Sequence, residues 1–285
     1  MRAAVLGTGI MGAAMARSLA REGNEVTVWN RSPERAESVA GDGITAHATI
    51  AEAVAGADVV FTMLYDADSV IEVSAELVGA LEPTAVWAQS TTVGPLGMAR
   101  IVAEAGDLGD RLLDAPVLGT RQPAEDGKLI VLVSGPGAAR EQAQPAFDAI
   151  GGRTQVVGEE PGWASALKLV CNSWVAVLTA GTAQAVALAQ AQGLDPQLFL
   201  EAIEGTATDS AYAHAKGALM LSRSWDDPSF ALDSVRKDVG LMIDAAGETG
   251  SPDDLLTTLL ALFDRASERG HGGHDMAAVR TAFDG

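Results

Sequence analysis

The chain contains the glycine motif Gly7-Thr8-Gly9-Ile10-Met11-Gly12 directly after the apolar run Ala3–Leu6. A strand, a glycine-rich turn and a helix in this order form the phosphate-binding turn of a βαβ unit. Gly7 allows the tight turn, Gly9 lets backbone N–H groups approach a pyrophosphate, and Gly12 lets the helix pack closely on the strand. The motif therefore predicts a dinucleotide site, whose cofactor loop also contains Thr8, Ile10 and Met11.

The residues after the second predicted strand, Val26–Trp29, indicate which dinucleotide binds. Enzymes that use NAD usually place an acidic residue there to bind the ribose 2′-hydroxyl. This chain has Asn30-Arg31-Ser32 instead. A guanidinium group offers a fork of donors to a 2′-phosphate, and Asn30 and Ser32 can add hydrogen bonds. We therefore expect NADP(H) to be preferred over NAD(H).

The first 160 residues alternate short β-type runs with helical patterns, which is typical of βαβ units and a parallel sheet. Helix boundaries are marked by Ser32-Pro33 and by the capping box that begins at Thr49, while Gly23 and Gly151-Gly152 stand where helices should end. The predicted strands are Ala3–Leu6, Val26–Trp29, Val59–Met63, Ala85–Ala88, Arg111–Asp114, Leu129–Ser134 and Gln155–Val157.

From about Pro161 the strand signals stop, and Trp163–Gln192 reads as one unbroken helix. The sequence thus predicts an α/β fold: a Rossmann-type parallel-sheet domain over residues 1–160, then an all-helical domain over residues 161–285 led by a long interdomain helix. The further predicted helices are Pro196–Ile203, Ala211–Leu221, Ser234–Glu248 and Pro252–Arg269.

The amino-acid composition argues against several classes of function. The 285 residues carry a formal net charge of −19, and such a surface repels nucleic acid and anionic lipid. We find no uninterrupted apolar run of membrane-spanning length and expect a cytoplasmic protein.

The single cysteine, Cys171, excludes an internal disulfide and is expected in the core. His271 and His274 have metal-ligand spacing, but glycines surround them and further ligands are missing nearby, so we expect no metal.

Several short segments follow the glycine motif in an ordered series, and in these residues the chain resembles the β-hydroxyacid dehydrogenase family over nearly its whole length. The family includes 3-hydroxyisobutyrate dehydrogenases and glyoxylate/succinic semialdehyde reductases. The segments are Thr62-Met63-Leu64, Ser90-Thr91-Thr92-Val93-Gly94-Pro95, Asp114-Ala115-Pro116-Val117, Lys168 with Asn172, Lys237-Asp238 and Gly270-His271-Gly272-Gly273-His274-Asp275.

The resemblance implies a role for Lys168 as the acid/base that exchanges a proton with the substrate oxygen during hydride transfer. A lysine can do so when burial or a neighbouring positive charge lowers its pKa. Asn172, four residues on, shares its helix face and would orient the substrate or Lys168. By the same resemblance Thr92 and Lys237 would contact the nicotinamide half of the cofactor, Met63-Leu64 would line the cofactor cleft, and Asp238 would lie near the substrate.

The substrate loop departs from the family pattern. Members typically carry a serine after Ala-Pro-Val, and that serine helps to bind a substrate carboxylate, whereas this chain has Leu118-Gly119-Thr120. Backbone N–H groups near Gly119 and the Thr120 hydroxyl could still bind an anion. The expected substrate is therefore a small aldehyde or β-hydroxyacid, with a bulkier or less polar carbonyl compound as the alternative.

Two other functions are alternatives to the hypothesis of an aldehyde or β-hydroxyacid oxidoreductase. Imine reductases share the architecture and the Asn-Arg-Ser/Thr segment, but they usually lack the lysine that stands here at Lys168. A non-catalytic dinucleotide-binding protein has no need for Lys168 and Asn172.

A long apolar helix needs more cover than a small domain supplies, so we expect a homodimer or higher homo-oligomer.

Overall fold

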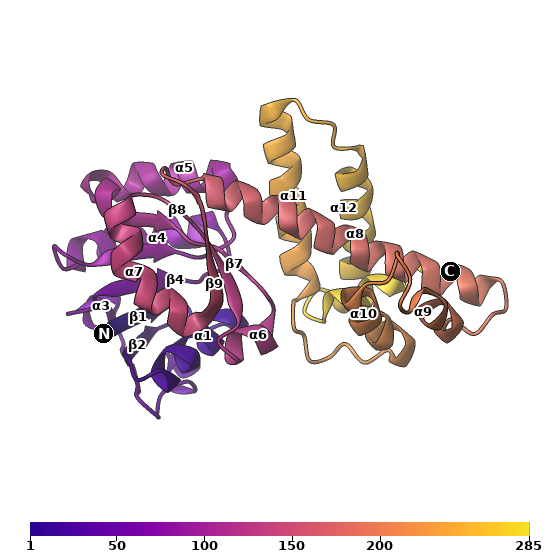
Figure 1. Ribbon diagram of the computed structural model, residues 1–285, viewed down its shortest axis with the longest axis horizontal. Coiled ribbons are helices and arrows are strands. Elements are labelled where there is room, and N and C mark those ends of the chain that lie inside the picture. The colour runs from indigo at the N-terminus through magenta and orange to yellow at the C-terminus, as the bar shows by residue number, and fades with distance from the viewer. Residues whose placement is uncertain (285) are drawn as a thin grey trace. The chain divides into compact units, whose positions relative to one another are not determined.

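The computed structural model describes residues 1–284, apart from the side chain of Asp107. The chain divides into two compact units, Met1–Lys168 and Leu169–Gly285. Gly285, the last residue of the helical domain predicted from the sequence, lies outside the described residues. The first unit is an α/β sheet domain and the second is helical, as the sequence predicts, with the long helix running from one into the other (Figure 1).

The first unit alternates strands and helices along most of its length. Its strands are β1 (Arg2–Leu6), β2 (Glu25–Trp29), β3 (Ile44–Ala46), β4 (Val59–Thr62), β5 (Val86–Gln89), β6 (Leu112–Asp114), β7 (Val117–Leu118), β8 (Leu129–Ser134) and β9 (Gly151–Gly158). Its helices are α1 (Ile10–Arg21), α2 (Pro33–Glu37), α3 (Ile50–Val54), α4 (Ala67–Ala80), α5 (Gly94–Ala105), the 3₁₀ turn η1 (Gly106–Arg111), α6 (Arg121–Glu125) and α7 (Gly137–Ile150).

The strands form one sheet in the order β3-β2-β1-β4-β5-β6-β8-β7, with β9 also paired to β8. The neighbours from β3 to β6 are parallel, as predicted, whereas β8 runs antiparallel to β6 and β7. Only residues 119–128 join β7 to β8, and so short a connection favours an antiparallel return over a crossover. The longer connection through α7 brings β9 back parallel to β8.

The register of the parallel strands aligns their carboxyl ends in one row. Leu6 of β1 pairs with Trp29 of β2 and Thr62 of β4, Thr62 pairs with Gln89 of β5, and Gln89 pairs with Asp114 of β6. The loops that follow these strands therefore meet at the same edge of the sheet. In open α/β sheets this edge is where ligands bind.

Two hydrophobic cores hold the sheet between its helices. Residues of α1 and α7 pack on one face, and residues of α3, α4 and α5 pack on the other (Figure 1). Because the central strands are covered on both faces, all residues of β4 and β5 are buried. Continuous apolar runs, rather than alternation, are what such strands require.

Several local predictions are confirmed and others are corrected. Thr49 makes the expected capping box with Glu52 at the start of α3, and Gly23 follows α1 with a φ of 82°. Ser32 is the N-cap residue of α2, but its side chain makes no capping hydrogen bond. The short strands β3 and β7 were not predicted, and β9 is longer than the predicted Gln155–Val157.

The second unit contains most of α8 (Trp163–Ala191), then α9 (Gln197–Ile203), α10 (Ala211–Ser222), α11 (Leu232–Thr249), α12 (Asp254–Ala266), the π-helical turn η2 (Ser267–His271) and the 3₁₀ segment η3 (Met276–Phe283). Its core joins α8, α10, α11, α12 and η3. The sequence predicts the α-helices, but it does not predict η3, whose residues are nearly all buried.

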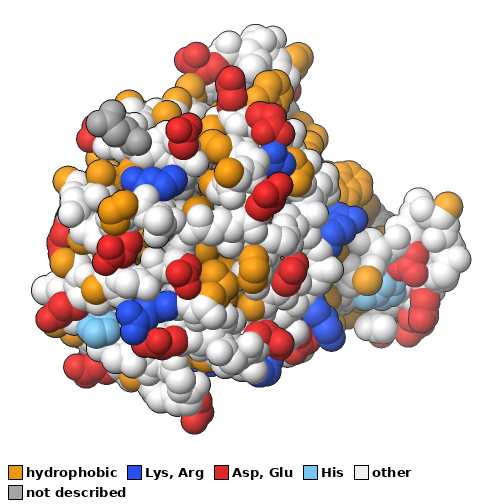
Figure 2. All heavy atoms as spheres, turned by 60° about the vertical axis from the view of Figure 1, so that its left-hand side comes forward, with side chains coloured by type: hydrophobic (Ala, Val, Ile, Leu, Met, Phe, Trp, Pro, Cys, Tyr) orange, Lys and Arg blue, Asp and Glu red, His pale blue; other side chains and the backbone are white. Residues whose placement is uncertain are grey.

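Helix α8 has the length and apolar composition of a membrane span, which qualifies the expectation drawn from the sequence. Of its most apolar window, 44% is buried inside the protein. The core helix of a soluble protein passes the same test, so this single helix is weak evidence for a membrane. Acidic side chains are scattered over the face shown in Figure 2 and do not gather in one patch.

Candidate dinucleotide and substrate site

A groove of ≈ 440 Å³ lies at the carboxyl edge of the sheet in the first unit. Seven residues predicted from the sequence line it: Gly7, Gly9, Asn30, Arg31, Ser32, Met63 and Leu64. The prediction did not include the remaining lining residues, which are Trp29, Arg35, Ile50, Tyr65, Ser69, Glu72, Val73 and Glu76. Thr8 lies between two lining glycines, and Ile10, Met11 and Gly12 begin α1 directly behind them.

The three glycines of the motif serve different purposes. A Cβ on Gly7, which has a φ of +104°, would collide with the Met63 carbonyl, and a Cβ on Gly12 would collide with the Gly7 carbonyl. These two glycines are therefore required by backbone packing. A Cβ on Gly9 would meet no protein atom within 4 Å, and its φ of −70° suits any residue. Packing therefore does not explain Gly9, and the prediction that a pyrophosphate approaches this turn would account for it.

The side chain of Asn30 ties the loop after β2 to the loop after β1. Its Oδ1 accepts from Thr8 N at 3.1 Å, and its Nδ2 donates to Ser32 O at 3.1 Å. The Thr8 hydroxyl is buried and has no hydrogen-bond partner among the described residues. A buried hydroxyl without a partner costs free energy, so it fits a site where a ligand oxygen completes the hydrogen bonding.

Arg31 and Arg35 place two guanidinium groups in the wall of the groove. Arg31 is highly exposed, and its Nη1 lies 3.6 Å from Glu72 Oε2 on α4. An exposed ion pair at this distance contributes little to stability. The arginine is therefore held loosely enough to turn toward an anion in the groove.

The loop after β5 is fixed against the loop after β4. The Thr91 hydroxyl accepts from Leu64 N at 2.9 Å and donates to Thr62 O at 3.2 Å. Gln89 binds both backbone groups of Thr91, with its Oε1 2.7 Å from Thr91 N and its Nε2 3.0 Å from Thr91 O. Thr92, predicted to contact the nicotinamide half, follows directly and is half-buried.

The carboxylate of Asp114 anchors the start of α8. Its Oδ2 accepts from Gly162 N and Ser165 N, both at 2.8 Å, and from Ser134 Oγ at 3.2 Å, while its Oδ1 accepts from Ser165 Oγ at 2.7 Å. Ser134 Oγ also accepts from Ala164 N at 3.0 Å. Burial raises the pKa of Asp114, and the hydrogen bonds from Ser165, Gly162 and Ser134 oppose that rise.

This anchor sets the helical phase of Lys168, which lies three residues after Ser165 and is 8% exposed. The first N–H groups of a helix need partners outside it, and here buried oxygens from the sheet supply them. Sequence reasoning used Asp114 only as part of a family segment and missed this role. Ser165 lies 51 residues further along the chain, and no local pattern links the two.

A second buried carboxylate lies in the helical unit. Asp238 on α11 is 2% exposed, and its Oδ2 accepts from Asn172 Nδ2 at 2.7 Å. Its Oδ1 accepts from Lys237 Nζ at 2.7 Å. Three residues predicted for the site therefore meet in one chain of contacts. Because carboxylate oxygens only accept, the contact also fixes which way the Asn172 amide points.

The predicted substrate loop lies between β7 and α6. Leu118 is half-buried and pairs with Ile130 of β8. Gly119 has a φ of +132°, and a Cβ there would press on the Leu129 side chain. Thr120 is the N-cap residue of α6, and its side chain makes no capping hydrogen bond.

The remaining candidates of the sequence contribute little to this site. The Nδ1 atoms of His271 and His274 face each other at 2.9 Å, and the described residues contain no group of three side chains able to hold a metal ion. Cys171 is half-buried and not a full core residue, because the α8 face that carries it is only partly covered.

Two family models match the chain. The NAD binding domain of 6-phosphogluconate dehydrogenase matches residues 2–158, and the NAD-binding model of NADP-dependent 3-hydroxyisobutyrate dehydrogenase matches residues 162–283. The chain belongs to the β-hydroxyacid dehydrogenase family. The enzyme is thus an NAD(P)-dependent oxidoreductase, as its sequence predicts.

Individual relatives agree with the family models. Glyoxylate/succinic semialdehyde reductase 2, a chloroplastic protein of Arabidopsis thaliana, is 32% identical over 281 residues, covering 98% of this chain and 78% of the relative. The crystal structure of 3-hydroxyisobutyrate dehydrogenase from Salmonella typhimurium superposes with a TM-score of 0.90 at 26% identity, covering 99% of each chain.

Imine reductases share the architecture at lower structural similarity. The Streptomyces aurantiacus imine reductase superposes with a TM-score of 0.62 at 25% identity and covers 100% of both chains. The hydroxyacid dehydrogenases are therefore the nearer group. Because relatives such as the two described above are named reductases and dehydrogenases, the enzyme class is favoured over a non-catalytic dinucleotide-binding protein.

The geometry of the glycines predicts that one substitution lowers stability and that a matched one weakens cofactor binding. Gly12→Ala should lower the free energy of unfolding by at least about 2 kcal/mol, because the new methyl group collides with backbone. Gly9→Ala should leave stability within about 0.5 kcal/mol but weaken NADPH binding at least about tenfold, because its methyl group occupies the approach of the pyrophosphate.

Denaturant unfolding and fluorescence titration with NADPH would measure the two quantities. A Gly9→Ala protein that binds NADPH normally would contradict the placement of the pyrophosphate at this turn.

Proposed function

We propose that the enzyme uses NADP(H) to interconvert a small carboxylate-bearing aldehyde and the corresponding hydroxy acid, with Lys168 as the general acid/base. The observation that carries the proposal is the burial of Lys168 on a helix whose start is bonded to Asp114, in line with the carboxyl ends of the strands that form the groove. A buried ammonium group anchored at this edge is suited to proton transfer and poorly explained as a surface lysine.

Each residue near the proposed reaction centre would have its own role. When bound, the nicotinamide cofactor would supply or accept the hydride. In the reductive direction Lys168 gives a proton to the substrate oxygen as negative charge develops there, and in the oxidative direction it takes that proton back. Asn172 lies one helical turn further along α8 and would hold the substrate or Lys168. Asp238, whose two oxygens bind Asn172 and Lys237, would position these groups rather than contact the substrate alone.

The preference for NADP(H) is supported by the charges in the groove wall. Arg31 and Arg35 line it together with Ser32, and the segment after β2 lacks the acidic residue that would bind a ribose 2′-hydroxyl. Two guanidinium groups and a hydroxyl suit a 2′-phosphate. In the groove wall these two arginines balance Glu72 and Glu76, whereas the chain as a whole carries a net charge of −19.

The substrate class is supported by the relatives and modified by Leu118. The matched reductase of Arabidopsis thaliana is named for glyoxylate and succinic semialdehyde, which both carry a carboxylate. Leu118 adds apolar volume where family members typically carry a serine hydroxyl. A longer or less polar carbonyl compound, or a cyclic imine, is therefore the second candidate.

Turnover of a substrate panel tests the reaction. We expect NADPH consumption with glyoxylate, succinic semialdehyde or methylmalonate semialdehyde, and a loss of about 10²–10⁴-fold in Lys168→Ala, because general acid/base catalysis contributes that much. NADPH binding should stay within about twofold. Lys128→Ala, which removes an exposed lysine, is the control and should retain full activity.

Near-normal turnover in Lys168→Ala would show that Lys168 is not the general acid/base. Turnover confined to apolar aldehydes or cyclic imines would contradict the carboxylate-bearing substrate and support the second candidate class.

Arg31→Ala tests the cofactor preference. We expect the Kd for NADPH to rise at least about tenfold while the Kd for NADH changes less than about twofold, since a charge-assisted contact to the 2′-phosphate is worth about 1.5–3 kcal/mol. Arg153→Ala, in which an exposed arginine of β9 is removed, serves as the control. Equal weakening of both nucleotides by Arg31→Ala would contradict a 2′-phosphate contact.

We also propose that a second copy of the chain covers one face of α8. Trp163, Val170, Trp174 and Leu188 are 61%, 64%, 62% and 54% exposed, and with Leu167 and Val177 they follow spacings typical of helix-to-helix seams. From Trp163 to Val177 the stripe is apolar, and exposed tryptophans in such a stripe are unfavourable in water. In a twofold interface this stripe would lie against the same stripe of the second copy.

Trp174→Glu should therefore convert a homodimer or larger homo-oligomer into smaller species, because it places a charge in the centre of the seam. Light scattering after size-exclusion chromatography would measure the mass, and Leu255→Glu on α12 is the control, since Leu255 is comparably exposed outside the seam. A monomeric wild-type protein, or an unchanged mass in Trp174→Glu, would rule out this interface.

A further inference from the structure

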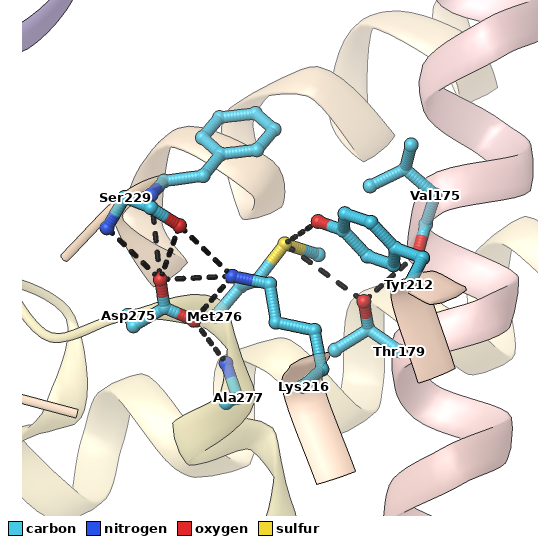
Figure 3. A network of polar contacts seen from close by, with 9 residues as sticks. Val175, Thr179, Tyr212, Lys216, Ser229, Asp275, Met276 and Ala277 are labelled. Atoms are coloured by element: carbon cyan, nitrogen blue, oxygen red, sulfur yellow. Dashed lines mark hydrogen bonds and ion pairs between the residues drawn. The ribbon is translucent and has the colours of Figure 1, made fainter. Parts of the chain in front are cut away.

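A buried ion pair joins two distant segments of the helical unit (Figure 3). Lys216 on α10 is 3% exposed and Asp275, just before η3, is fully buried. The ammonium nitrogen lies 2.7 Å from Asp275 Oδ1 and 2.9 Å from Oδ2, and it also donates to Ser229 Oγ at 3.0 Å. None of these residues belongs to the site proposed above.

The carboxylate of Asp275 also holds the segment that leads into α11. Its Oδ2 accepts from Ser229 N at 3.0 Å, from Ser229 Oγ at 2.9 Å and from Phe230 N at 3.4 Å. Met276 N donates to Phe230 O at 2.9 Å, and Leu232 N donates to His274 O at 2.8 Å. The residues just before α11 are therefore fastened at several points to the residues before η3.

The same network reaches α8 through Met276. Tyr212 Oη lies 3.1 Å from the Met276 sulfur, and Thr179 Oγ1 on α8 lies 3.8 Å from it (Figure 3). Thr179 is seven residues from Asn172, so both side chains lie on the same side of α8. The network thus contacts the helix that carries Asn172 and the lead-in of the helix that carries Lys237 and Asp238.

Stability alone does not account for such a pair. Removing two charges from water is costly, and well-packed apolar residues often stabilise a fold as well as a buried ion pair does. What an ion pair with further hydrogen bonds supplies is a defined geometry. Burial pushes the pKa of Asp275 up, but Lys216 and the hydrogen bonds from Ala277 and Ser229 outweigh it and hold the pKa below its ordinary value.

We infer that Lys216 and Asp275 are positioning residues, which fix the lead-in of α11 against α8 so that Asp238 meets Asn172 and Lys237. The inference rests on the proposed role of those three residues in the reaction. Asp238 lies six residues after the first residue of α11, and within a rigid helix its place follows from where and how the helix begins. A shift of about 1 Å in a catalytic arrangement can cost about 10²-fold in rate.

The test compares Lys216→Met with Arg280→Met in the full-length enzyme. Arg280 is also buried, and it binds Asp284 and Gln190. Gln190 lies about 27 Å along α8 from Asn172, at 1.5 Å per residue. Both variants should lower the melting temperature, but only Lys216→Met should lower kcat, by about 10–100-fold. The Kd for NADPH, which depends mainly on the first unit, should change less than about threefold.

A double variant keeps the inference testable if Lys216→Met does not fold. Lys216→Met combined with Asp275→Leu buries no unpaired charge, so it should recover part of the lost stability. It still removes the acceptor for Ser229, Phe230 and Ala277 and should keep the low kcat. A kcat within about twofold of wild type in either folded variant would overturn the inference. An equal loss of kcat in Arg280→Met would overturn it too, by showing that general destabilisation is the cause.

Asp238→Asn separates this inference from the proposed function. If Asp238→Asn lowers kcat and Lys216→Met does not, the positioning role is wrong and the site stands. If Asp238→Asn leaves kcat unchanged, the site itself is wrong.

Discussion

The carboxylate of Asp114 satisfies the start of α8, and the placement of Lys168 depends on it. A helix begins with N–H groups that have no partner within the helix, and two of those groups here donate to one buried side chain at the end of a central strand. The anchor fixes both the position and the rotation of α8 where it leaves the sheet. Lys168, three residues after Ser165, thereby acquires a defined direction.

Buried carboxylates play the same part again in the helical unit. Asp238 joins Asn172 to Lys237, and Asp275 joins Lys216 to the lead-in of α11. Each carboxylate accepts from two or more donors, which makes its burial tolerable. An enzyme with a large excess of acidic residues thus uses a few of them, deep inside, as connectors between elements that are far apart in the sequence.

The sequence predicts what depends on neighbouring residues and misses what depends on distant ones. The glycine motif, the Asn30-Arg31-Ser32 segment and the i, i+4 spacing of Lys168 and Asn172 are local, so the groove and the long helix could be predicted. The contacts of Asp114 with Ser165 and of Lys216 with Asp275 span 51 and 59 residues. The reversal of β8 depends on loop length, and Arg35 enters the groove only through the turn of α2. No periodicity or motif reports such pairings.

The anchored start of α8 also limits how this enzyme can change in length. Each residue of a helix turns its successors by about 100°. One residue inserted between Ser165 and Lys168 would swing the lysine, and every later side chain of α8, to another side of the helix. The helix contains no proline that could absorb the error. The first turns of α8 therefore have a fixed length. Insertions and deletions are tolerable instead in an exposed connection without predicted site residues, such as residues 192–196 between α8 and α9.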